Sequence, residues 1–173
     1  MFDPHHGFDA PFECVEKYLD ILDQIPLPAY VEGELDDKTV WQQIDHRGAY
    51  GGRGMAYTDM SDEDHRLVRA SYWAMCELID EQVGRTLSAL EETGQRDNTL
   101  VIYTSDHGEM LGDHGIYLKG PYFYDCAIHV PLIMNMPGVI EPQVVDDLVE
   151  CVDIPETILD LAGSSLHPGM QGK

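Results

Sequence analysis

The sequence predicts an α/β protein with a mostly parallel or mixed sheet flanked by helices. A helical apolar stripe runs through residues 62–90, and the β-branched run Thr99–Thr104 follows it after a tight turn. A helix, a turn and a strand in this order form half of a parallel crossover. Asp106 and His107 come directly after the strand, at the position where open α/β sheets bind ligands.

The length of 173 residues suits one domain with a hydrophobic core, and the 43% of hydrophobic residues is typical of a globular protein. We therefore expect a single domain over residues 1–173. Residues 1–60 are expected to form irregular, substrate-facing loops. Residues 61–163 are expected to form, in order, a helix, a strand, the loop that carries Asp106, two further strands and a helix.

The formal net charge of -22 restricts the partners of the chain. Nucleic acid and anionic membrane surfaces are excluded, because their phosphates would be repelled. An anionic substrate requires a cation or a further basic segment to offset this charge locally. No apolar run approaches the roughly 18 to 20 residues of a membrane span. No signal peptide is visible, so we expect a cytoplasmic protein if Met1 is the natural start.

The first third of the chain is dominated by helix breakers. Residues 13–25 have helical spacing and end at Pro26, whereas residues 26–60 contain many glycines and prolines. A long irregular segment of this kind is typical of a lid or a substrate-facing loop. Arg47 and Arg53 lie in it and are expected to be solvated, although either could meet an anion.

The remaining elements follow from caps and short apolar runs. Ser61–Asp64 is an acidic helix start, and Gly94 suits the end of that helix. Val130–Met134 is predicted to be a second buried strand and Val144–Val152 an edge strand. A capping box at Asp153–Glu156 is predicted to open the last helix, which ends at Gly163.

The four cysteines, Cys14, Cys76, Cys126 and Cys151, are widely spaced and include no CxxC pair. This spacing does not support a disulfide scaffold or a zinc ribbon. We expect four reduced thiols, mostly buried.

The segment Ser105-Asp106-His107-Gly108-Glu109 carries the side chains most suited to chemistry. Carboxylate and imidazole are ligand types that divalent cations accept. Lys119, a short loop further on, could bring a positive charge to an anionic substrate. The alternative is that Asp106 and His107 only form a turn or cap a helix, as such residues beside glycine often do.

Three segments in order, Ser105–Glu109, Gly112–Gly115 and Lys119–Asp125, resemble the second metal-binding segment of the sulfatase family, part of the alkaline-phosphatase superfamily. Pro4-His5-His6-Gly7-Phe8 resembles the Pro-His-x-Pro-Phe segment of the same family, with Gly7 in place of proline. The resemblance implies a partial alkaline-phosphatase-like (sulfatase) fold.

The resemblance also implies roles for individual residues. Asp106 and His107 match metal ligands, Lys119 matches the lysine that contacts the sulfate group, and His5 matches the histidine that contacts the scissile ester. Glu109, Asp113 and His114 recur in the motif with supporting or loop-shaping roles, and Asp125 and His129 are weaker matches. The expected metal is Ca²⁺, with Mn²⁺ or Mg²⁺ as alternatives.

The nucleophile of the family has no counterpart in this sequence. Sulfatases use a formylglycine made from the cysteine or serine of a Cys-x-Pro-Ser-Arg type motif, and an upstream aspartate pair completes the metal site. None of the four cysteines here is followed by such a motif. Formylglycine is therefore expected only in sequence outside this chain. We expect the isolated chain to be inactive and to bind metal weakly, because Ca²⁺ prefers six or more oxygen ligands.

Three functions remain open. The first is a segment of a sulfuric ester hydrolase that acts on a sulfated small molecule or glycan. The second is a phosphonate monoester or phosphodiester hydrolase of the same superfamily. The third is a non-catalytic binding or assembly module. Open sheet edges would favour a homo-oligomer or docking with the remainder of a catalytic domain.

Overall fold

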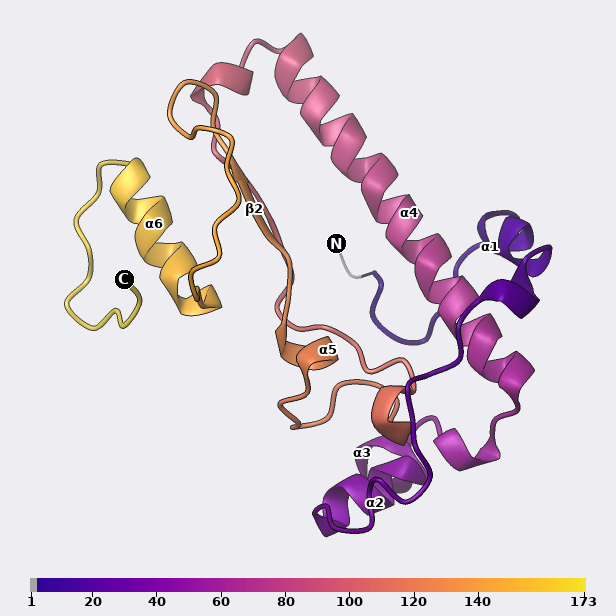
Figure 1. Cartoon of the computed structure of the whole chain (residues 1–173). Coiled ribbons are helices and arrows are strands. Elements are labelled where there is room, and N and C mark those ends of the chain that lie inside the picture. The colour runs from indigo at the N-terminus through magenta and orange to yellow at the C-terminus, as the bar shows by residue number, and fades with distance from the viewer. Residues whose placement is uncertain (1–2) are drawn as a thin grey trace. The chain divides into compact units, whose positions relative to one another are not determined.

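The computed structural model describes residues 3–173. The chain divides into two compact units, of which the first ends at Pro137 and the second begins at Gly138. The first unit carries most of the elements (Figure 1). Its helices are α1 (Phe12–Leu19), α2 (Val40–His46), α3 (Ala49–Gly52), α4 (Asp62–Glu92) and α5 (Asp125–Ile128), and its strands are β1 (Val101–Thr104) and β2 (Leu132–Asn135). The predicted combination of helices and sheet is confirmed, and all predicted site residues lie in this unit.

Helix α4 is the longest element and leads at its C-terminal end toward β1 (Figure 1). Ser61 and Asp64 cap it reciprocally: the Ser61 amide donates to the Asp64 carboxylate at 2.9 Å, and the Asp64 amide donates to Ser61 Oγ at 3.2 Å. Gly94, at φ +66°, ends it, and the Gln95 amide bonds back to the Leu90 carbonyl at 2.9 Å. Both predicted ends of this helix are confirmed.

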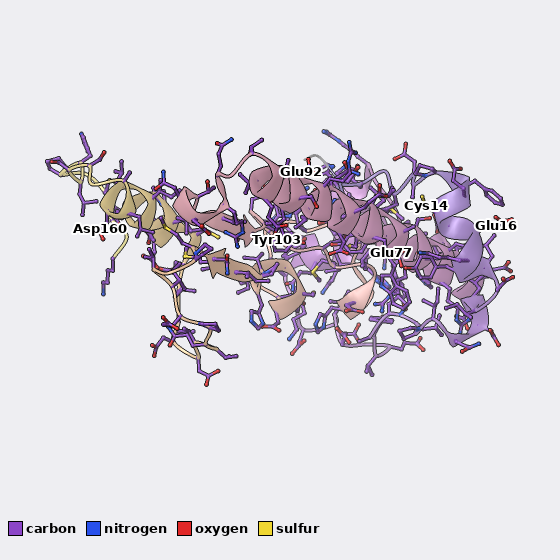
Figure 2. All side chains as sticks on the ribbon, turned by 90° about the horizontal axis from the view of Figure 1, so that it is seen from above. Cys14, Glu16, Glu77, Glu92, Tyr103 and Asp160 are labelled. Carbon is purple, nitrogen blue, oxygen red and sulfur yellow. The ribbon has the colours of Figure 1, made fainter. Side chains whose placement is uncertain are left out.

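Helix α1 packs against α4 (Figure 2). The Tyr18 ring meets the Trp73 ring edge-on at 5.8 Å, and Lys17 forms an ion pair with Glu77. The helix predicted over residues 13–25 is shorter than expected, because α1 ends at Leu19 and a separate 3-10 turn covers Leu22–Gln24.

The two strands pair antiparallel, with Val101 opposite Asn135 and Thr104 opposite Leu132. The expected parallel crossover is therefore not formed by these strands. The prediction that both strands are buried is also wrong, since Tyr103 of β1 is 40% exposed and Ile133 of β2 is 61% exposed. An apolar β-branched run predicts a strand, but it does not predict whether other elements cover the two faces of that strand. Within residues 3–173 each strand has a single strand neighbour.

Residues 26–60 are more ordered than predicted. They contain α2, α3 and a 3-10 turn at Tyr57–Asp59, and a capping box between Thr39 and Gln42 starts α2. The core of the first unit centres on the loop over residues 110–118. Two clusters of buried residues form it: Phe8, Ala49, Met75, Tyr117 and Leu118 in one, and Leu35, Met110, Ile116 and Ala127 in the other.

The second unit contains α6 (Ile154–Leu161), which begins with Pro155 in its first turn, after a 3-10 turn at Cys151–Asp153. The edge strand predicted over residues 144–152 is not formed, and Val144 and Leu148 are exposed. The predicted capping box was also wrong. The Asp153 carboxylate instead accepts hydrogen bonds from the Glu150 and Lys173 amides, both at 2.9 Å, so it is unavailable to cap α6.

The cysteine prediction is confirmed in part. All four cysteines are in the reduced thiol form, but Cys76 and Cys151 are exposed and the other two are half-buried, so the expectation of burial was wrong. Within residues 3–173, none of the helices combines the length and the apolar character needed to cross a membrane.

Candidate active site

The end of β1 places a carboxylate and an imidazole side by side. The Asp106 carboxylate accepts the His107 amide at 3.1 Å, and Ser105 Oγ donates to the His107 carbonyl at 2.7 Å, so this segment forms a local turn. The turn leaves the Asp106 side chain 87% exposed, with Oδ2 at 3.6 Å from His107 Nε2. Both groups can therefore approach a single ligand.

The hydrogen bonding of His107 suits metal coordination. Its Nδ1 lies 2.8 Å from the Gly108 carbonyl, which can only accept a hydrogen bond. Nδ1 must therefore carry the proton, which leaves the Nε2 lone pair available to a cation. Asp106 and His107 thus fit a divalent metal as two of its ligands. Among the residues that the structure describes, no group of three or more His, Cys, Asp or Glu side chains gathers around a metal position, so the pair is a partial site.

Lys119 and His5 meet although they lie 114 positions apart, with Nζ of the lysine 2.7 Å from Nε2 of the histidine. An ammonium group can only donate, so His5 Nε2 accepts. The proton of the His5 ring is then on Nδ1, which donates to the His6 carbonyl at 2.7 Å. This arrangement presents a lysine cation supported by a neutral imidazole.

An open cavity of about 1030 Å³ is lined both by the Asp106–His107 pair and by His5, the partner of Lys119. His5, Asp106, His107 and Glu109 all line it, together with residues of α4 and β1. Lys119 is not among the lining residues, but it contacts His5, which is. Burial raises the pKa of Glu109. The Leu111 amide, Lys119, the Leu118 backbone and His107 oppose this rise. Glu109 therefore lies within electrostatic reach of both pairs.

Asp113 and His114 support the loop and are not among the residues that line the cavity. The Asp113 carboxylate accepts the Ala29 amide at 2.8 Å and pairs with Arg69 of α4. The His114 ring stacks on Tyr124 at 4.2 Å, and its Nδ1 lies 2.9 Å from the Glu34 carboxylate.

The weaker matches and the two arginines lie at the surface. Asp125 and His129 form an exposed pair at 3.5 Å, and His129 is at the cavity lining. Arg47 and Arg53 are exposed, as predicted.

Several supporting contacts were missed by sequence analysis. His65 Nδ1 lies 2.6 Å from the Tyr117 hydroxyl, and the Tyr122 hydroxyl donates to the buried Asp45 at 2.8 Å. Burial lowers the pKa of His65. Burial, and then the Asp45 contact, raise the pKa of Tyr122. The partners are 52 and 77 positions apart, so no local pattern could reveal them.

Comparisons with known proteins show the family and the fold of the chain. The Sulfatase family model matches residues 4–164. The sulfatase YidJ of Escherichia coli (strain K12), described as uncharacterized, is 35% identical over 160 residues, which make up 92% of this chain and 30% of YidJ.

Solved structures share the fold. The phosphonate monoester hydrolase SpPMH from Silicibacter pomeroyi matches with a TM-score of 0.74 and 35% identity over 88% of this chain and 31% of SpPMH. A protein solved in complex with its substrate D-glucosamine-2-N,6-O-disulfate has a TM-score of 0.75 over 98% of this chain and 44% of its own. At 20% identity it supports the fold alone. The chain thus spans less than a third of the length of YidJ and of SpPMH.

Proposed function

Because the chain belongs to the sulfatase family of the alkaline-phosphatase superfamily, we propose that it supplies part of the metal and sulfate site of a sulfuric ester hydrolase. The contact between Lys119 and His5 carries this proposal. Two segments at opposite ends of the first unit converge there, beside the cavity that Asp106 and His107 also line. Convergence of this kind is what an anion site requires and what an isolated turn does not explain.

Asp106 and His107 would hold a divalent cation, Ca²⁺ in the first instance and Mn²⁺ or Mg²⁺ as alternatives. The cation would supply positive charge opposite the sulfate oxygens. Further ligands must come from elsewhere, since these two residues form only a partial site. The cation would also offset, at the site itself, the repulsion between an anionic substrate and a chain of net charge -22.

Lys119 would neutralise the sulfate oxygens and donate to the bridging oxygen as the ester bond breaks. The His5 Nε2 lone pair orients the ammonium, and the His6 carbonyl fixes the His5 ring in turn. Lys119 and His5 therefore act as one unit, in which the lysine carries the proton for the leaving oxygen and the histidine positions it.

The nucleophile, a formylglycine in this family, would come from sequence outside these 173 residues. The substrate would be a sulfate ester of a small molecule or a glycan. The remainder of a catalytic domain, or a second copy of the chain, would be the protein partner. Glu109, which lines the same cavity, would support Lys119 and His107 electrostatically, while Asp113 and His114 would shape the loop.

A phosphonate monoester hydrolase is the second candidate, favoured by the 35% identity to SpPMH. The residues described here serve either ester, because both chemistries need a metal and a cation at a tetrahedral anion. The non-catalytic binding module remains the alternative from a different class.

The proposal is tested by titrating the chain with inorganic sulfate in the presence of Ca²⁺ and following the His5 ring by NMR. We expect the shifts to disappear in Lys119→Ala and to persist in Lys38→Ala, a surface control whose ammonium pairs with Asp37 at 3.5 Å. Equal sulfate binding by wild type and Lys119→Ala would contradict the proposal.

Two singly charged esters separate the candidate functions. A preference for 4-nitrophenyl sulfate over 4-nitrophenyl phenylphosphonate in binding would support a sulfatase, and the reverse preference would support the phosphonate candidate. We expect no turnover of either ester by the isolated chain. Turnover that Lys119→Ala abolishes would exclude the non-catalytic module.

A further inference from the structure

The cavity beside the candidate site continues between α4 and β1, which leave their connecting turn in different directions (Figure 1). The wall on the opposite side from α4 runs along β1 as far as Asp106 and His107. The apolar side chains of both walls are half-buried or exposed, so they are not part of the buried core. The α4 wall is formed by side chains at helical spacing on one face: Tyr72, Cys76, Ile79, Val83, Thr86 and Leu87.

β1 has one edge without a strand neighbour. It pairs with β2 on its other side, and residues 3–173 form no third strand. All four residues of β1 line the cavity, whereas none of the four residues of β2 does. The cavity therefore lies along the edge of β1 that faces away from β2. The N–H and C=O groups of such an edge are a template for a further strand.

The dimensions of the cavity suit a single extended segment. From Tyr72 to Leu87 the α4 wall is about 22 Å long at 1.5 Å per residue. A strand of about seven residues has the same length. One side-chain face of this strand would contact α4 and the other would remain open. Apolar and polar side chains should therefore alternate along it.

The surroundings of the cavity favour a basic strand. Asp80, which follows Ile79 on α4, is exposed, and the Asp106 side chain at the end of β1 is 87% exposed. With a net charge of -22 on the chain, lysine or arginine at the polar positions of the strand would be attracted. Because the chain spans less than a third of YidJ and of SpPMH, the strand would belong to the part of a catalytic domain that these 173 residues do not include.

We propose that the free edge of β1 and the apolar face of α4 form a docking groove for one extended, basic strand from the remainder of a catalytic domain. The inference rests on the proposed function, which makes that remainder the protein partner, and it assigns the surface and the kind of element that meet. The strand gains main-chain hydrogen bonds from β1 and buries its apolar side chains against Ile79, Val83 and Leu87.

The probe for the docking groove is a blocked seven-residue peptide that alternates valine with lysine, titrated into the chain and followed by NMR. We expect shift changes along Val101–Thr104 and slower hydrogen exchange at the β1 amides that β2 does not bind. The matched control peptide has the same sequence with an N-methyl group on every backbone amide. It keeps the charge and the side chains but cannot donate main-chain hydrogen bonds. Its affinity should be lower by about tenfold or more.

Val83→Asp tests the α4 wall. It places a carboxylate in the docking groove, so it should weaken binding of the unmethylated peptide by about tenfold or more. Ser88→Asp is the control, because it adds the same charge to an exposed position of α4 that does not line the cavity. It should bind the basic peptide at least as tightly as wild type. Tighter binding by both variants would show diffuse charge attraction alone and would overturn the proposal.

The peptide pair requires no variant, so it decides the question if melting curves show that Val83→Asp does not fold. Equal affinity for the two peptides, or no binding of the unmethylated one, overturns the docking groove. Wild-type dimers that Val83→Asp dissociates without peptide would place a second copy there and would also overturn it.

The sulfate titration keeps this inference separate from the proposed function. If the docking groove is overturned while inorganic sulfate still binds through Lys119, the proposed function stands. Absence of sulfate binding in wild type overturns the proposed function, and with it the assignment of the strand to a catalytic domain.

Discussion

Gly108, directly after His107, lies against the backbone of the α5 segment. A Cβ at this position would lie 2.0 Å from the Cys126 carbonyl oxygen, and backbone atoms cannot move aside cheaply. We expect Gly108→Ala to lower the free energy of unfolding by about 1 to 3 kcal/mol, measured by urea denaturation. Gly84→Ala is the matched control, since nothing lies within 4 Å of its Cβ in the middle of α4. The control should gain about 0.5 to 1 kcal/mol. Equal effects at the two glycines would contradict this packing.

His65 makes stability depend on pH. Burial lowers its pKa below the ordinary 6.5, so between the folded and unfolded pKa values the unfolded chain binds more protons. The free energy of unfolding should therefore fall as the pH drops through 6.5, and the penalty is complete below the folded pKa. The groups that face His65 are Asp62, Asp64, Arg69, Tyr57 and Tyr117.

Denaturation of His65→Gln at several pH values between about 7 and 5 checks this, because the variant should show a flatter pH dependence than wild type. His129→Gln, at an exposed histidine, serves as the control and should retain the wild-type slope. Parallel curves for wild type and His65→Gln would exclude His65 as the source.

At the scale of elements, Asp113 joins the site loop to α4. Its partner Arg69 is largely buried, with 13% of the side chain exposed, so the guanidinium depends on this carboxylate. Asp113→Asn should cost about 1.5 to 3 kcal/mol of unfolding free energy, as measured by thermal and chemical denaturation. Asp80→Asn, at an exposed position of α4, should change it by less than about 0.5 kcal/mol. A neutral Asp113→Asn would show that the loop is held elsewhere.

Elements whose ends are marked by nearby residues could be predicted from the sequence. The direction of strand pairing and the contacts between distant segments could not. The capping residues at Ser61 and Asp64 and the Gly94 stop define α4 within a few residues of sequence. The strand direction depends on how residues 105–131 fold back, which no periodic pattern records. The capping role expected of Asp153 was lost to the Lys173 amide, 20 positions away.

Over the whole molecule, the strand pair exposes an apolar surface. Tyr103 and Ile133 are opposite each other in the β1–β2 register and both are exposed. Exposed strands of this kind promote association. We expect sedimentation velocity to show concentration-dependent self-association, reduced by Ile133→Lys. Ile128→Lys, at an exposed isoleucine of α5, is the control for added charge. A monomer at every concentration would contradict this expectation.

The candidate site was predictable as far as its contiguous motif and its family resemblance extend. Asp106, His107 and Lys119 are read from one segment, and His5 from a motif near the start of the chain. Contacts elsewhere in the first unit, such as the one between Tyr122 and Asp45, join residues far apart in the chain, so no local pattern predicts them. The left-handed backbone of Tyr50 likewise has no signal in the sequence, because tyrosine does not favour that conformation.

A titration of the chain with Mn²⁺, followed by paramagnetic broadening in NMR spectra, tests whether Asp106 and His107 bind a metal. We expect the His107 ring and the end of β1 to broaden at the lowest Mn²⁺ concentration, together with the His5 ring, which lines the same cavity. Asp106→Ala should abolish this pattern. Broadening centred instead on the acidic start of α4, and unchanged in Asp106→Ala, would show only diffuse attraction to a chain of net charge -22 and would contradict a metal site at Asp106 and His107.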